Sequence, residues 1–311
     1  MATRVICFLL RLIAAPATLR PHPSWRLGND AKLSHFLLWH RMILWELLKT
    51  PCVIKWLDGL HIYAYPDNET SRAVFLTGLY EPNEFYWLDK VLEPGETFID
   101  IGANMGLYSL FAATKVGRCG VVVAIEPSGR DFERLRFHVE LNRLTNVHLL
   151  QVAASNHKGE ARLLVAPDRN AGHNTLGDFG YSGITPEATE TVRLKQVDDV
   201  VQSMGLQKVD FMKVDVEGAE FHVLQGAQDT LRLFRPTILL ELSDRTLRHQ
   251  GCHSGQIWDF LVREGYRMYR FSEQTGLPVQ AERKACFDSE NVIAVHKTLG
   301  GSWTYESVEE T

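Results

Sequence analysis

The feature that most constrains the fold is a regular alternation of short apolar runs with helical stretches, which begins at residue 96. Helical stretches start near Gly106, Ser128 and Gly218, and the apolar runs around them are TFIDIG, VVVAIE, VHLLQVAA, FMKVDV and TILLEL. Strands that alternate with helices are joined by right-handed crossovers and form a parallel sheet. The sequence therefore predicts an α/β fold in which helices cover both faces of a mostly parallel sheet.

The end of this region predicts an antiparallel finish to the sheet. After Gln256 the pattern indicates a helix, a strand at 267–271 and a final strand at 291–296. The helix after the FMKVDV run carries one apolar stripe, which predicts core positions: Phe221, Leu224, Leu231 and Phe234. Glu220 and Gln228 lie outside that stripe.

The first 77 residues predict an accessory helix and a β-hairpin. Apolar residues recur at helical spacing over 31–50 and stop at Pro51. The run VIKWLDGLHIYAYP follows, in which Asp58 and Gly59 favour a two-residue hairpin turn. We thus expect an accessory unit at 1–77, the catalytic domain at 78–298 and a disordered tail at 299–311.

Composition and charge narrow the partners. The net charge of -5 lacks the basic excess that nucleic-acid binding requires, so a small hydroxyl-bearing molecule is the expected partner. The five cysteines show no metal or disulfide spacing, which favours a cytoplasmic protein. The apolar start at 5–15 is interrupted by Arg11 and is too short to span a bilayer, so no stable membrane insertion is expected. Its composition is compatible both with a targeting segment and with an amphipathic helix, and the sequence does not decide between the two.

The run FIDIGANMG, at 98–106, predicts a strand, a glycine turn and the start of a helix. Gly102 and Gly106 would let the backbone approach a ligand at a helix N-terminus. A tight strand–helix connection needs glycine for steric reasons as well, so this motif alone does not decide between the two. Glu126 ends the next strand, where an acid can accept hydrogen bonds from ribose hydroxyls or, alternatively, cap the following helix.

Charge separates the candidate cofactors. Asp100, Asp215 and Glu217 would converge with Glu126 at the carboxyl ends of the strands. Such a field repels a pyrophosphate and favours a cofactor with a cationic sulfonium. This pattern favours S-adenosyl-L-methionine, and it leaves a nicotinamide-dependent oxidoreductase or an inactive binding protein as alternatives.

The order and wording of the motifs resemble the FkbM family of S-adenosylmethionine-dependent methyltransferases. The resemblance covers about 78–295 and rests on D-x-G-A-N-x-G, AIEPS, NAGHNTL and DVEGAE. It implies a Rossmann-like, seven-stranded class I methyltransferase fold with an antiparallel last strand, and O-methylation of a sugar or natural product. Asn104 replaces the glycine found in many other methyltransferases, and Asn tolerates the left-handed conformation that the turn needs.

The resemblance also implies roles for individual residues. The residues expected to bind the cofactor are Asp100, Gly102, Ala103, Asn104, Gly106, Glu126, Ala153, Ala154 and Asp215. The candidates for the catalytic base are His173, Asp215 and Glu217, although one of the two acids could instead cap the helix that starts near Gly218. His173 and Asn174 lie in an apparent long loop at 167–190 and are candidate substrate contacts. No complete metal-ligand set is evident.

Overall fold

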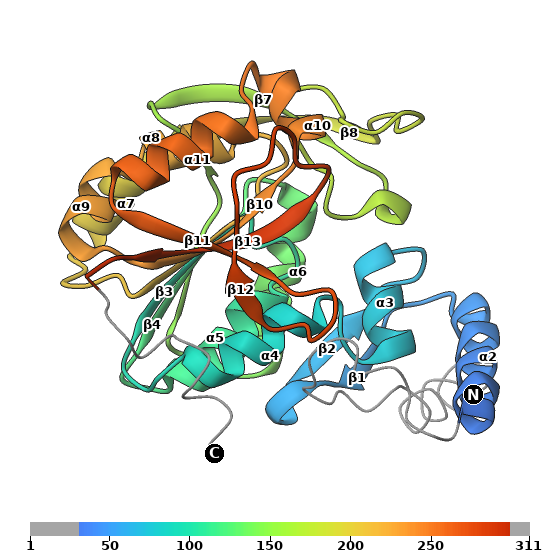
Figure 1. Cartoon of the computed structure of the whole chain (residues 1–311). Coiled ribbons are helices and arrows are strands. Elements are labelled where there is room, and N and C mark those ends of the chain that lie inside the picture. The colour runs from blue at the N-terminus through green and yellow to red at the C-terminus, as the bar shows by residue number, and fades with distance from the viewer. Residues whose placement is uncertain (1–30, 299–311) are drawn as a thin grey trace.

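A computed structural model describes residues 31–298, and Figure 1 shows its central sheet. The sheet has eight strands in the order β12-β11-β13-β10-β9-β3-β4-β5. Their bounds are β3 Thr97–Ile101, β4 Val121–Ile125, β5 Val147–Leu150, β9 Phe211–Val214, β10 Thr237–Leu242, β11 Tyr266–Phe271, β12 Pro278–Gln280 and β13 Glu290–His296. Strands β5, β4, β3, β9 and β10 are parallel, whereas β13 is antiparallel to both of its neighbours. The predicted α/β fold with its antiparallel last strand is confirmed, and β12 is an unpredicted edge strand.

Helices cover both faces of this sheet. One face packs against α4 Pro82–Val91, α5 Leu107–Val116 and α6 Gly129–Leu141. The other packs against α7 Val197–Met204, α8 Glu220–Gln225, α9 Gln228–Phe234 and α11 Ser254–Arg263. Because side chains alternate along a strand, Phe98 belongs to the first core and Ile99 to the second. Burial on both faces explains why the parallel strands read as continuous apolar runs.

The single helix predicted after β9 is instead two helices, α8 and α9. Gly226 lies at the break, where an added Cβ would come within 2.0 Å of the Ser155 carbonyl oxygen. Glu220, outside the predicted apolar stripe, is buried with 1% of its surface exposed. Periodicity alone could not detect this burial, because the carboxylate bonds to the backbone of its own turn.

A second, three-stranded sheet flanks the predicted loop region and includes only the last three residues of that loop. It consists of β6 Ala153–Ala154, β7 Gly159–Val165 and β8 Ala188–Lys195, with β7 and β8 antiparallel. The connecting segment therefore spans 166–187 and contains the short helix η2 Asp168–Asn170. The polar residues at 188–190, predicted as loop, are part of β8.

The N-terminal unit comprises helix α2 Ala31–Leu47, hairpin strands β1 Cys52–Lys55 and β2 His61–Ala64, and helix α3 Glu69–Thr77 (Figure 1). The hairpin is confirmed, but its loop has five residues and includes the short helix η1 Leu57–Gly59. Asp58 and Gly59 both adopt positive φ, as expected for this dipeptide. The predicted apolar start and polar tail lie outside the described residues. No helix within 31–298 is long and apolar enough to cross a membrane.

Helix α6 holds the hairpin in place through two buried or partly buried side chains. The Asn142 side chain exchanges two hydrogen bonds of 2.7 Å with the backbone of His61. His138 accepts a hydrogen bond from the Tyr63 amide at Nε2, 2.8 Å away, so its proton is on Nδ1, which donates to the Met105 carbonyl at 2.7 Å. One neutral imidazole therefore joins the hairpin, α6 and the turn after β3.

This arrangement predicts a loss of stability in acid. Burial lowers the pKa of His138 from 6.5 to about 4. A neutral native histidine is favourable above the unfolded pKa, and this contribution is lost as pH falls from 6.5 through 4. The unfolding free energy should fall by roughly 3 kcal/mol over that window because of His138 alone. Denaturant titrations of the wild type and His138→Gln at several pH values would measure the difference, with the exposed His148→Gln as the control.

Candidate active site

Two adjoining cavities open at the carboxyl ends of the parallel strands. A narrow pocket is lined by Glu126 and by apolar residues that include Ala153, Ala154 and Leu163. A wider cavity of about 320 Å³ extends toward α3 and the segment between β7 and β8. The residues that line both are Gly102, Asn104, Gly172, Asp215 and Glu217. These shared residues make the two cavities parts of one site.

The glycine turn after β3 forms the floor of this site. Gly102 has a φ of +80°, and a Cβ there would lie 1.7 Å from the Asp215 carbonyl oxygen. Asn104 has a φ of +50°, so the left-handed conformation expected for it is confirmed. Ala103, another predicted cofactor residue, lines the wide cavity. The turn is therefore in close contact with the end of β9.

Two predicted cofactor residues lie behind the turn and line neither cavity. Asp100 is wholly buried, its Oδ2 accepts a hydrogen bond of 2.5 Å from Ser109, and burial raises its pKa. Gly106 begins α5 with a φ of +93°, where an added Cβ would lie 2.4 Å from Leu135 Cδ1. Gly106 is therefore explained by helix packing, because a side chain at this position would overlap Leu135. Sequence spacing could not separate that requirement from ligand contact.

Glu126 lines the narrow pocket and also anchors two backbone segments. Its carboxylate accepts hydrogen bonds of 2.8 Å from the amides of Asn104 and Ser128, and Ser128 is the N-cap of α6. Burial raises the pKa of Glu126 to about 8. The two alternatives for this residue are thus compatible, because one carboxylate both supports a helix start and faces the pocket.

His173 and Glu217 form a pair in the wide cavity. The Nδ1 atom of His173 lies 2.8 Å from Glu217 Oε1, which leaves Nε2 for another partner. Burial lowers the pKa of His173, but the hydrogen bond and charge of Glu217 outweigh it, so the net shift is upward. Glu217 itself has a φ of +50°. A strained residue thus orients an imidazole, a pattern common at functional sites.

The segment that carries His173 is held in place by the two residues that follow it, Asn174 and Thr175. Asn174 accepts a hydrogen bond from the Ala166 amide and donates one of 2.7 Å to Asp131 on α6. Thr175 donates to the Glu217 carbonyl at 2.9 Å. Asn174 lines the narrow pocket, but its polar atoms serve the segment itself. A network, not a free loop, positions His173.

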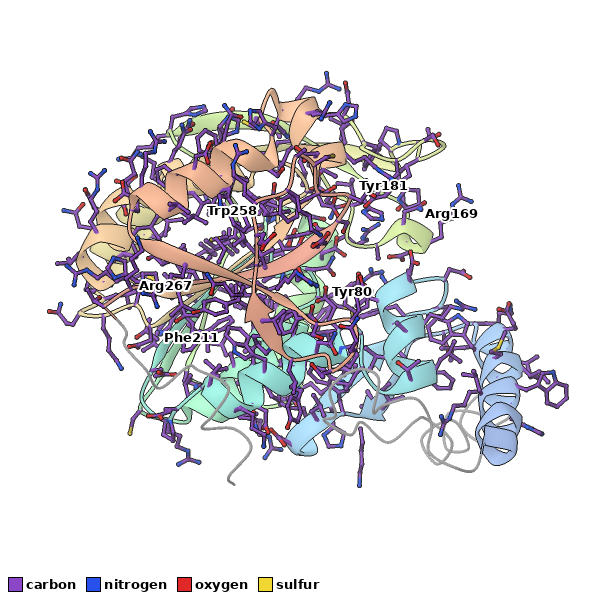
Figure 2. The ribbon with its side chains drawn as sticks, in the orientation of Figure 1. Tyr80, Arg169, Tyr181, Phe211, Trp258 and Arg267 are labelled. Atoms are coloured by element: carbon purple, nitrogen blue, oxygen red, sulfur yellow. The ribbon has the colours of Figure 1, made fainter. Side chains whose placement is uncertain are left out.

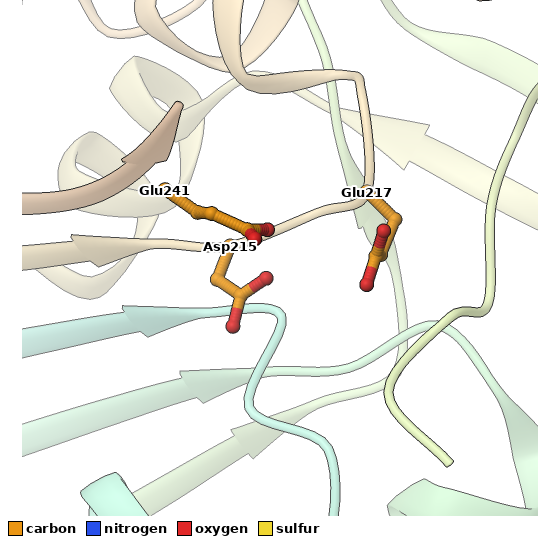
Figure 3. A group of neighbouring side chains, drawn as sticks. All are labelled: Asp215, Glu217 and Glu241. Carbon is orange, nitrogen blue, oxygen red and sulfur yellow. The ribbon is translucent and has the colours of Figure 1, made fainter. Parts of the chain in front are cut away.

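Glu217 also belongs to a group of three neighbouring carboxyl side chains, which Figure 3 shows: Asp215, Glu217 and Glu241, with oxygens within 4.8 Å of one another. Such oxygen clusters can hold a divalent cation. Here Asp215 Oδ2 already accepts a hydrogen bond of 2.9 Å from Lys213 Nζ. Glu241 and Lys213 are not among the site residues that the sequence predicted. The acid near the end of the TILLEL run was an available signal, because the carboxyl ends of neighbouring parallel strands meet at one edge.

Glu220 stabilises the turn that carries these acids. Its carboxylate accepts hydrogen bonds of 3.1 Å from the amides of Val216 and Gly218. Burial raises the pKa of Glu220 to about 7. The N-cap of α8 is Ala219, which makes no side-chain cap hydrogen bond, so neither Asp215 nor Glu217 has the capping function considered for it, and both line the cavities.

Comparison with known proteins identifies the family. The methyltransferase FkbM domain matches residues 100–268. The chain belongs to the FkbM methyltransferase family. This membership argues against the nicotinamide-dependent oxidoreductase that the sequence left open.

Individual relatives are distant and matched in part. The 31-O-demethyl-FK506 methyltransferase FkbM of Streptomyces tacrolimicus is 30% identical over 163 residues, 44% of this chain and 62% of that protein. The AMB antimetabolite synthetase AmbE of Pseudomonas aeruginosa is 26% identical over 65% of this chain, which spans only 11% of AmbE. The crystal structure of methyltransferase FkbM from Methylobacillus flagellatus KT is 16% identical, with a TM-score of 0.40 over 72% of this chain and 53% of that chain.

The contact between Gly102 and Asp215 predicts unequal effects of two glycine substitutions. Gly102→Ala should cost several kcal/mol of stability, on the order of a severe core clash, because the new methyl overlaps a backbone oxygen. Gly95→Ala has a similar φ of +89° with nothing within 4 Å of the new Cβ, so only about 1 kcal/mol is expected. Thermal and denaturant unfolding of both variants would measure this, and equal losses would contradict the role assigned to the contact.

Proposed function

We propose that this protein is an S-adenosylmethionine-dependent O-methyltransferase that acts on a hydroxyl group of a sugar or natural product. The observation that carries the proposal is the His173–Glu217 pair in a wide cavity that shares residues with a narrower pocket. Family membership supports methyl transfer. The oxygen acceptor is supported by the pairing of a candidate base with a cavity large enough for a small molecule.

The residues of the narrow pocket fit the proposed cofactor. Glu126 offers carboxylate oxygens suited to ribose hydroxyls, and Ala153 with Ala154 supplies a small apolar surface suited to adenine. Gly102 allows close backbone approach, and Asp215 would face the positively charged end.

S-adenosylmethionine supplies a methyl group on a positively charged sulfur. When bound, it would supply this methyl group to the acceptor oxygen, and S-adenosylhomocysteine would remain. His173 would accept the hydroxyl proton at Nε2, and Glu217 would hold the ring and stabilise the imidazolium. The network around Asn174 and Thr175 would keep this base aligned, and alignment supplies much of the rate in such displacements.

The wider setting belongs to the same proposal. The name of the Streptomyces relative specifies 31-O-demethyl-FK506, an example of a natural-product acceptor. We retain 78–298 as the methyltransferase domain and 1–77 as an accessory unit, with a cytoplasmic location. An inactive, methyltransferase-like binding protein would not release S-adenosylhomocysteine during turnover, whereas the proposed enzyme would, so an assay of this product distinguishes the two.

The proposed cofactor predicts measurable binding. S-adenosylmethionine and S-adenosylhomocysteine should bind with micromolar affinity, about -8 kcal/mol, by calorimetry. Glu126→Ala should weaken binding by about 1.5–3 kcal/mol, because the ribose hydroxyls would lose their hydrogen-bond partner and stay buried without one. Glu140→Ala, which removes an exposed carboxyl group near the end of α6, should bind normally. The absence of any heat of binding at millimolar ligand would contradict the cofactor assignment.

The proposed base predicts a defined pH profile. Because His173 must be neutral to accept a proton and its pKa is raised, kcat should increase with pH through a value above 6.5. Glu217→Gln removes the charge that raises this pKa, so the rising limb should move to lower pH. His173→Ala should lower methyl transfer by roughly 10²-fold or more with cofactor affinity near wild type.

The exposed His157→Ala is the matched control and should keep the wild-type profile. A loss of only a few-fold in His173→Ala, or an unmoved limb in Glu217→Gln, would contradict the base assignment. The role would then pass to Asp215, which Asp215→Asn tests in the same assay.

A further inference from the structure

The wide cavity contains many more acidic than basic groups. Its lining has one lysine and one histidine, and its five carboxyl groups are Glu69, Glu81, Asp215, Glu217 and Glu241. These acids come from α3, the segment before α4, the turn after β9, and β10. A ligand in this cavity therefore meets carboxyl groups from four parts of the fold.

The single lysine is not available to balance a ligand's charge. Lys213 is buried with 5% exposure, donates to Asp215 at 2.9 Å and lies 4.7 Å from the centre of the Tyr108 ring. Its ammonium group thus neutralises one carboxylate of the wall. His173 is bound to Glu217 in the same manner. Both basic groups are paired within the protein, and an excess of acid faces the cavity.

The pKa of Glu241 shows how this cavity affects the ionisation of a carboxyl group. Burial raises the pKa of Glu241 to about 9, and the charges of Asp215 and Glu217 add to the shift. A carboxylate on an acceptor would meet the same burial and the same two charges. The net positive charge of the proposed cofactor would offset only part of that repulsion, because Asp215 and Glu217 would both still face an added carboxylate.

Aromatic rings add a second property to the cavity. Tyr80 and Tyr181 line it from two segments far apart in the sequence, and Figure 2 labels both. The Tyr181 ring lies 4.5 Å from the His173 ring, so one aromatic surface adjoins the candidate base. Tyrosines combine an apolar ring with a polar tip, which suits a polyhydroxylated ring.

Resting on the proposed function, we infer that the acceptor is an uncharged or amine-bearing polyol, and that Asp215 and its neighbouring acids exclude acceptors that carry a carboxylate or phosphate near the reacting hydroxyl. Repulsion between like charges at short range in a poorly hydrated cavity is the physical basis of this selectivity. The hydroxyl groups of a neutral polyol can instead donate hydrogen bonds to the carboxylates.

Three probes that differ in charge test the inference on the full chain. Methyl glucoside, glucosamine and glucuronate are titrated at pH 7 against protein saturated with S-adenosylhomocysteine, in EDTA and with ligand-observed NMR. Methyl glucoside should bind at least about tenfold more tightly than glucuronate, and glucosamine at least as tightly as methyl glucoside. Asp215→Asn should reduce the difference between methyl glucoside and glucuronate to about threefold or less.

A distant charge variant is the control. Asp259→Asn, which removes an exposed carboxylate on α11, should keep the wild-type ratio. Glucuronate binding as tightly as methyl glucoside, restoration of its binding by Mg²⁺, or no binding of any probe would overturn the inference. Calorimetry with S-adenosylhomocysteine alone is done first, so that a failure of the proposed cofactor is distinguished from a failure of the acceptor class.

Discussion

The site depends on one backbone contact, between the turn after β3 and the end of β9. Gly102 lies so close to the Asp215 carbonyl that no side chain fits, and the Asp215 amide donates to the Ile101 carbonyl at 3.0 Å. This contact makes the floor of the narrow pocket and the acidic wall of the wide cavity continuous. A larger residue at 102 would separate them, and Glu126, which accepts from the Asn104 amide, would lose its position as well.

The acids in and after the turn that follows β9 look equivalent in the sequence but have different roles in the structure. Glu220 points inward and bonds to the turn's own amides, which compensates for the left-handed conformation of Glu217. Glu217 is then free to hold His173, while Asp215 pairs with Lys213. Burial and hydrogen-bond partners, not residue type, decide which carboxyl group is structural and which faces a ligand.

The sequence predicts those features that depend on a short stretch of neighbouring residues. The sheet strands, the positive φ of Asn104 and the final antiparallel strand each depend on a short stretch of residues, and the structure confirms them. Glu241 and Lys213 escaped because their placement depends on which strands become neighbours. The three-stranded sheet also escaped, since β7 and β8 are half-exposed and joined by a polar segment without periodicity. Gly102 and Gly106 carry the same sequence signal, and at both positions a Cβ would overlap protein atoms, but Gly102 also lines the cavities, whereas Gly106 does not.

Helix α6 connects the parts of the protein that surround the site. Its N-cap, Ser128, donates its amide to Glu126 in the narrow pocket, and its first turn holds the His173 segment through Asp131. Its last turns hold the N-terminal hairpin through His138, whose other nitrogen bonds to the turn after β3. A disturbance of the hairpin therefore reaches the glycine turn through one imidazole. The N-terminal hairpin is in this respect part of the framework of the candidate site, because it shares both a core and a hydrogen-bonded helix with the residues that line the cavities.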